Sequence, residues 1–210
     1  MTRKALAVAV VAAVFAASPA LACKGKNVLF EDNFTDTDPA WEMWDQVKID
    51  GGMMKITAMA GHVAEIFYKA DTYDKADVCV DVISPDMSGD PKNLGVPAVL
   101  FSGQAYDDTY FLYAAPAYGT AGVARLLKGK WLYPVPFRKL DGMNNQSGAT
   151  NTLRVTINGA HATAYVNDHK LADFKINAGE GGGFVGLNVD GGQAGPVTWS
   201  FKNFKVTDLP

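Results

Sequence analysis

Short segments in which apolar and polar residues alternate recur along most of the chain. A period of two is typical of β-strands that bury one face. Ten such segments, separated by Gly, Pro, Asp and Asn, cover residues 54–58, 62–68, 77–83, 98–102, 109–115, 122–127, 152–157, 162–167, 183–189 and 197–206. The sequence shows no convincing helix period beside them. The pattern predicts an all-β domain, and a sandwich of two sheets fits the number of strands.

The stretch NTLRVTINGAHATAYVNDHKLADF, residues 151–174, has the clearest hairpin pattern. Apolar residues alternate with polar ones on both sides of Asn158-Gly159, and Asn167-Asp168 follows the second run. These turn residues tolerate the positive φ that tight turns require. The glycine-rich stretch 179–195 resembles a phosphate-binding loop in composition, but strand-like residues follow it where such a loop needs a helix. We therefore expect tight turns that flank a buried strand.

The segment ADVCVDVIS places three valines on one face and Asp77, Cys79 and Asp81 on the other. Asp77 and Asp81 would lie about 13 Å apart along an extended strand. This exceeds the separation of paired catalytic carboxylates in glycoside hydrolases, which is at most ~9.5 Å. We expect both to be solvated surface charges.

The first 22 residues have the layout of a secretory signal peptide. Arg3 and Lys4 precede an uncharged apolar run from Ala5 to Ala17, and the triplet Ala20-Leu21-Ala22 offers a cleavage site. The run is shorter than the ~20 residues of a membrane span, and no later segment approaches that length. The sequence predicts an exported protein, periplasmic or secreted, with one domain over residues 23–210.

Without Arg3 and Lys4, the chain carries 17 basic and 22 acidic side chains, a net charge of about −5. This acidic balance, without a Lys/Arg cluster, argues against nucleic acid or anionic lipid as a partner. Nothing in the sequence indicates the oligomeric state.

The two cysteines of the chain, Cys23 and Cys79, indicate one disulfide in an exported protein. Cys23 would then tie the N-terminal segment across the outside of a sheet. The alternative is a lipid-anchored Cys23 at the new N-terminus, although Leu21 lies one position later than in most lipoprotein signals.

Five motifs in order resemble the concanavalin A-like lectin/glucanase jelly rolls. They are LFEDNFTDTDPAWEMW, DGGMMKI, the hairpin above, GGFVGLNVDGG and VTWSFKNFKVTDL. The closest branch is the 3-keto-disaccharide hydrolase-like domain. The resemblance implies a curved jelly-roll sandwich of two antiparallel sheets, adjacent terminal strands, and a ligand on the concave sheet or its rim.

The same resemblance implies a structural calcium ion where the terminal strands meet, bound by carboxylate and backbone oxygens. Glu31, Asp32 and Asp208 are the candidate ligands. No other cofactor is indicated, because His62, His161 and His169 are scattered without metal-ligand spacing.

The glucanases of this superfamily carry a catalytic strand of the form Glu-x-Asp-x-x-Glu. At the matching place this chain reads DDTYFLYAA, with Asp107 and Asp108 ahead of the strand. The leading interpretation is an exported carbohydrate-binding or surface-interaction domain without this catalytic motif. The alternative is a hydrolase or lyase for glycosides or keto-disaccharides, with Glu65 and Asp190 as the first candidate carboxylates.

Aromatic and polar residues gather between positions 104 and 138, a combination typical of sugar sites. From this region we predict a ligand site of Tyr113, Arg125 and Trp131. Trp131 would offer a stacking plane and Arg125 hydrogen-bond donors. The alternative is that these rings fill the sandwich interior. For Trp41 and Trp44 we expect packing in the core or at a sheet edge.

Overall fold

The computed structural model describes residues 23–210, so the predicted signal peptide, residues 1–22, lies outside the described residues. The described part contains fourteen strands and two short 3-10 helices. The strands are β1 (Val28–Asp32), β2 (Val47–Ile49), β3 (Met54–Ala58), β4 (Val63–Tyr73), β5 (Lys75–Ile83), β6 (Val96–Ala105), β7 (Asp108–Ala115), β8 (Thr120–Leu127), β9 (Lys130–Lys139), β10 (Thr150–Asn158), β11 (His161–Val166), β12 (His169–Lys175), β13 (Gly183–Asp190) and β14 (Val197–Thr207). The helices are η1 (Pro91–Asn93) and η2 (Pro116–Tyr118).

All ten predicted strand segments are confirmed, and β1, β2, β9 and β12 are added to them. Strand β9 was hard to predict because Pro134 and Pro136 interrupt its pattern. Proline is tolerated at a sheet edge, and β9 is the last strand of its sheet. The predicted turn residues Gly159, Asn167 and Asp168 all have positive φ.

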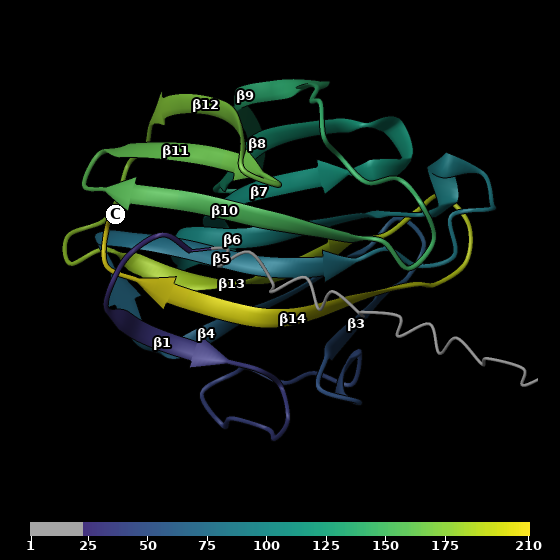
Figure 1. The fold of residues 1–210 in the computed structure, drawn as a ribbon, viewed down its shortest axis with the longest axis horizontal. Helices are drawn as coiled ribbons and strands as arrows, with labels where there is room; N and C mark the ends of the chain where they lie inside the picture. The colour runs from purple at the N-terminus through teal and green to yellow at the C-terminus, as the bar shows by residue number, and fades with distance from the viewer. Residues whose placement is uncertain (1–22) are drawn as a thin grey trace, which may run out of the picture.

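The strands form two antiparallel sheets packed face to face (Figure 1). The eight-stranded sheet, in front in Figure 1, has the order β12-β11-β10-β5-β14-β3-β2, with β1 added beside β14. The six-stranded sheet behind it has the order β4-β13-β6-β7-β8-β9. This arrangement confirms the predicted jelly-roll sandwich.

The main core lies between the sheets and draws side chains from both, among them Val78 and Val80 of β5 and Phe101 and Leu112 of the opposite sheet. A second, smaller apolar cluster contains side chains of the six-stranded sheet alone: Phe67, Ala98, Leu100, Phe111, Tyr113 and Ala124. These residues alternate with core residues along their strands, so they lie on the outer face of that sheet, away from its partner.

The terminal strands lie side by side, because β1 pairs antiparallel with β14, as the resemblance implied. The predicted disulfide between Cys23 and Cys79 is confirmed, with 5.6 Å between the Cα atoms. The alternative of a lipid-anchored Cys23 needs a free sulfur and is not compatible with this pairing. Among residues 23–210, no helix is both long and apolar enough to cross a bilayer.

The prediction that Asp77 is a solvated surface charge is wrong. Asp77 is fully buried and accepts hydrogen bonds from Arg154 Nε at 2.8 and 3.0 Å and from the backbone N–H of Lys24 at 2.8 Å. The segment around the disulfide covers it. Alternation placed Asp77 correctly on the outer face of β5, but only the long-range contact with residues 23 and 24 removes that position from water.

Candidate functional site

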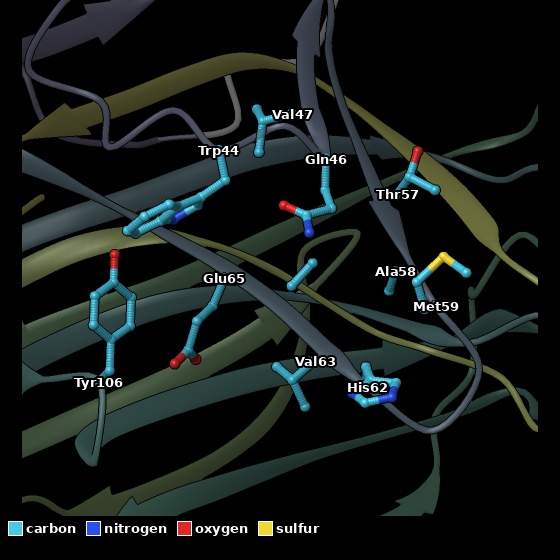
Figure 2. Close-up of a pocket in the computed structure, with 11 residues that line it drawn as sticks. Trp44, Gln46, Val47, Thr57, Ala58, Met59, His62, Val63, Glu65 and Tyr106 are labelled. Carbon is cyan, nitrogen blue, oxygen red and sulfur yellow. The ribbon is translucent and has the colours of Figure 1, made fainter.

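A pocket of about 650 Å³ lies along β4, the edge strand of the six-stranded sheet, next to the β2-β3 edge of the other sheet (Figure 2). Its lining residues come from β2, β3, β4 and the connecting segments: Trp44, Gln46, Val47, Thr57, Ala58, Met59, His62, Val63, Ala64, Glu65 and Tyr106. The volume falls within the usual range for small-molecule sites, ~300 to 1,000 Å³. The pocket is therefore large enough for one or two sugar rings.

Trp44 and Tyr106 stand together at one end of the pocket, and His62 stands at the other (Figure 2). The rings of Trp44 and Tyr106 have centroids 6.5 Å apart. Trp44 is 52% exposed, so it does not pack in the core and its packing at a sheet edge stays a prediction, whereas Trp41 is buried as predicted. The Tyr106 hydroxyl donates a hydrogen bond to Glu42, which holds the Tyr106 ring in place.

Glu65 extends from β4 between the two ends of the pocket (Figure 2). Its Oε2 atom is buried and has no hydrogen-bond partner among the described residues. Burial raises the pKa of Glu65 from 4.5 to about 7, because the charged form loses its hydration. The group therefore exchanges a proton near neutral pH.

Glu65 is the first member of a polar row that crosses the outer face of the six-stranded sheet. Strand register places Asn188 of β13 directly opposite Glu65, Ala98 of β6 opposite Asn188, and Tyr113 of β7 opposite Ala98. The Oδ1 atom of Asn188 and the Tyr113 hydroxyl are also buried without a partner in the described structure. We call Glu65, Asn188 and Tyr113 the polar row.

Asp190 lies two residues beyond Asn188 on the same face, because side chains alternate along β13. Because Asp190 stands opposite Val63, it is the diagonal neighbour of Glu65 across β13 and β4. Diagonal neighbours on antiparallel strands have Cα atoms about 7–8 Å apart. Burial raises the pKa of Asp190. The pKa of Tyr113 is also raised, first by burial and then by the charges of Asp190 and Glu65, so both carboxylates act on the Tyr113 hydroxyl.

The structure does not bring the predicted ligand residues Tyr113, Arg125 and Trp131 together. Tyr113 and Trp131 share the outer face, where each ring packs near Phe111 at 5.5 and 5.1 Å. Arg125 lies opposite Tyr110, a residue of the main core, and pairs with Asp108 at 2.8 Å. The grouping is therefore wrong for Arg125, and ligand binding by Tyr113 and Trp131 stays a prediction.

The proposed calcium ligands Glu31, Asp32 and Asp208 each have another partner. Glu31 pairs with Lys205 at 2.8 Å, Asp32 accepts hydrogen bonds from Phe34 N and Trp41 Nε1, and Asp208 accepts two from Asn27. Residues 23–210 contain no group of three His, Cys, Asp or Glu side chains that could hold a metal ion. Each of the three side chains is thus engaged within the described structure, and the calcium site implied by the resemblance stays a prediction.

The sequence did not single out Asn188, and it gave Trp44 a packing role. Asn188 lies in the strand GFVGLNVD, where a polar amide among apolar residues could have marked it as a candidate site residue. Of the three histidines, His62 lines the pocket, whereas His161 and His169 belong to β11 and β12 of the other sheet.

Neither a scan against protein-family models nor a search of curated proteins finds a match to this chain. Several solved structures share its fold. The carbohydrate-binding module CBM66 from Bacillus subtilis aligns with a TM-score of 0.62 at 16% identity, over 80% of this chain and 96% of that chain. The metal-free Emp46p carbohydrate recognition domain aligns with a TM-score of 0.64 at 14% identity, over 85% and 95%.

The Bacillus licheniformis β-glucanase aligns with a TM-score of 0.63 at 12% identity, over 85% of this chain and 97% of that chain. At such low identity these similarities show the fold alone. The fold is that of the concanavalin A-like jelly rolls, as the sequence motifs indicated. Membership of the 3-keto-disaccharide hydrolase-like branch stays a prediction.

Proposed function

We propose that this protein is an exported carbohydrate-binding domain and that the pocket along β4 is its ligand site. The observation that carries the proposal is a pocket of about 650 Å³ that the exposed Trp44 indole lines together with Glu65, Gln46 and His62. A sugar ring has an apolar face that stacks on an indole and hydroxyls that hydrogen-bond to carboxylate, amide and imidazole groups. The pocket offers both.

Three further observations support the proposal. Solved structures of the same fold include a carbohydrate-binding module and a carbohydrate recognition domain. The disulfide between Cys23 and Cys79 suits an oxidising compartment, which agrees with export through the predicted signal peptide. The outer face of β7, where the glucanases keep their catalytic strand, carries Thr109, Phe111 and Tyr113.

Paired tryptophan variants test the site. Trp44→Ala should weaken binding of oligosaccharides by about 1–3 kcal/mol, as expected for loss of a central aromatic contact, with little change in melting temperature. Trp131→Ala is the matched control at the far edge of the same sheet, since Trp131 is 39% exposed and packs on Phe111. Calorimetry on a panel of neutral, acidic and amino oligosaccharides gives the affinities. A loss of binding in the Trp131 variant alone would move the site to the predicted Tyr113 and Trp131 face.

A hydrolase or lyase is the second candidate, and one observation favours it. Glu65 and Asp190 lie on one face of adjacent strands, which is the arrangement that paired catalytic carboxylates require. The raised pKa of Glu65 suits a general acid near neutral pH. Turnover of an oligosaccharide by the wild type that disappears in both Glu65→Gln and Asp190→Asn would establish this function in place of simple binding.

A further inference from the structure

The polar row presents three buried oxygens that no group in residues 23–210 satisfies: Glu65 Oε2, Asn188 Oδ1 and the Tyr113 hydroxyl. Buried polar atoms in native proteins nearly always have partners, so three on one cross-strand row indicate partners other than protein side chains, either ordered water or a ligand group. Asn188 is the clearest case, because its side chain is fully buried. Its Nδ2 atom is engaged with Ala64 O at 3.4 Å, and Oδ1 remains without a donor.

The surroundings of the row are acidic and lack a compensating cation. Asp190 adds a second carboxylate on the same face, and neither Glu65 nor Asp190 takes part in an ion pair within the described structure. Lys69 follows Glu65 on the same face of β4, but its Nζ lies 3.8 Å from Glu42 and 4.2 Å from the centre of the Phe184 ring. The row therefore offers hydrogen-bond acceptors and negative charge to whatever enters it.

We infer that the polar row is a subsite for an ammonium group, and that among carbohydrates it selects amino sugars with a free amine. This inference rests on the proposed carbohydrate-binding function. An ammonium group has three donors that point in different directions, so it can serve Glu65 and Asn188, which lie directly opposite each other on β4 and β13, at the same time. It also places a positive charge beside two carboxylates. A hydroxyl or an N-acetyl group offers one donor and no charge, and a sugar carboxylate offers none.

Access to the subsite runs through the pocket, because Glu65 belongs to both. A sugar stacked on Trp44 would direct a substituent along β4 toward Glu65. The other titratable groups around Glu65 are Tyr106 and His62 in the pocket, Lys69 and Glu42 beside Tyr106, and Tyr113 and Asp190 on the outer face. Ala98, a fully buried residue, separates Asn188 from Tyr113 in the row.

Binding of an ammonium group should be linked to a proton. Burial raises the pKa of Glu65 to about 7, so the carboxyl is partly protonated at neutral pH before the ligand arrives. A positive charge beside it favours the ionised form, and Glu65 therefore releases a proton on binding. Affinity for the amine should rise as pH increases toward 7 and fall again where the amine itself loses its charge.

Isothermal titration calorimetry at pH 7 with tetrasaccharides of glucosamine, N-acetylglucosamine, glucose and galacturonic acid tests the subsite. The glucosamine oligomer should bind about 10- to 100-fold more tightly than the glucose and N-acetylglucosamine oligomers, the effect of one or two charge-assisted hydrogen bonds. The galacturonic acid oligomer should bind most weakly. Repeating the titration in buffers of different ionisation enthalpy should show release of up to one proton.

Glu65→Gln should reduce the preference for glucosamine to a few-fold and abolish the proton release, while binding of the glucose oligomer remains. Glu31→Gln is the matched control, because it removes the same charge from β1 in the other sheet and should leave the preference unchanged. The melting temperature of each variant confirms folding. Asp190→Asn, measured in the same way, should lower the preference by a smaller factor.

Each outcome decides the inference. Binding of all neutral oligomers without a preference for the amine overturns the subsite and leaves the carbohydrate-binding function intact. An equal loss of preference in Glu31→Gln means attraction to the acidic protein as a whole and also overturns it. Binding of calcium or magnesium ions alone, lost in Glu65→Gln, assigns the row to a metal instead. Absence of binding to any oligosaccharide overturns the proposed function together with the subsite.

Discussion

Replacing Glu65 with glutamine should remove a pH dependence of stability that the wild type carries. Glu65 has its pKa raised by burial from 4.5 to about 7. Between these values the folded protein holds a proton at Glu65 that the unfolded chain has released. The contribution of Glu65 to the free energy of unfolding must therefore fall as pH rises through this window. This contribution is complete only below about pH 4.5.

The magnitude follows from the two pKa values. One pKa step corresponds to 1.36 kcal/mol, so ionisation of Glu65 should cost the folded wild type about 3 kcal/mol by pH 8. The Glu65→Gln side chain has nearly the same shape and no charge to desolvate. Relative to the wild type, the variant should gain about 2.5 kcal/mol between pH 5 and pH 8, because the unfolded chain is already largely ionised at pH 5. For a domain of this size the gain amounts to about 5–10 °C in melting temperature.

Urea unfolding at pH 5 and pH 8, with the disulfide intact, measures this effect. The comparison is the difference between variant and wild type at each pH, because titrations of distant groups occur in both proteins and cancel. Glu31→Gln, at a position on the other sheet, should show no such change. A difference that stays within about 0.5 kcal/mol across the two pH values would refute the reasoning and show that Glu65 titrates like an exposed carboxylate.

Three further perturbations have definite expectations. Tyr113→Phe removes a buried hydroxyl that lacks a partner, so stability should stay equal or rise by about 1–2 kcal/mol in thermal unfolding, and a clear loss would reveal a partner for the hydroxyl. Asp77→Asn leaves the buried Arg154 without its counter-charge and should cost about 3–5 kcal/mol in urea unfolding, whereas an exposed pair would cost less than about 1 kcal/mol. Reduction of the disulfide between Cys23 and Cys79 should cost about 4 kcal/mol, the chain-entropy value for a separation of 56 residues, and an unchanged melting temperature in reductant would contradict this.

Local sequence was sufficient for the strands and the type of fold. Alternation depends on the geometry of each strand alone, which is why all ten predicted segments appear in the structure. The paired cysteines and the aromatic terminal strands likewise carried their own signal. Strand β9 escaped prediction because two prolines interrupt its pattern, although they are compatible with an edge position.

The candidate site depended on contacts that alternation does not encode. Alternation divides a strand into two faces, but it does not say which residues of distant strands stand opposite each other. Glu65, Asn188 and Tyr113 share a row only because β4, β13, β6 and β7 pair in one register. Arg125 and Tyr113 are separated for the same reason, since the register assigns them to opposite faces.

Burial of charged groups also required the tertiary structure. Asp77 reads as a surface residue within its strand, and it is buried because the disulfide from nearby Cys79 to Cys23, 56 residues earlier, holds the N-terminal segment over it. Glu65 has a raised pKa because burial among segments distant in sequence, such as those of Trp44 and Asn188, excludes water from its carboxyl. The sequence by itself determined which residues form strands and what sandwich they build. The tertiary structure decided which polar groups lose their water, because desolvation is the sum of contacts from segments far apart in the chain.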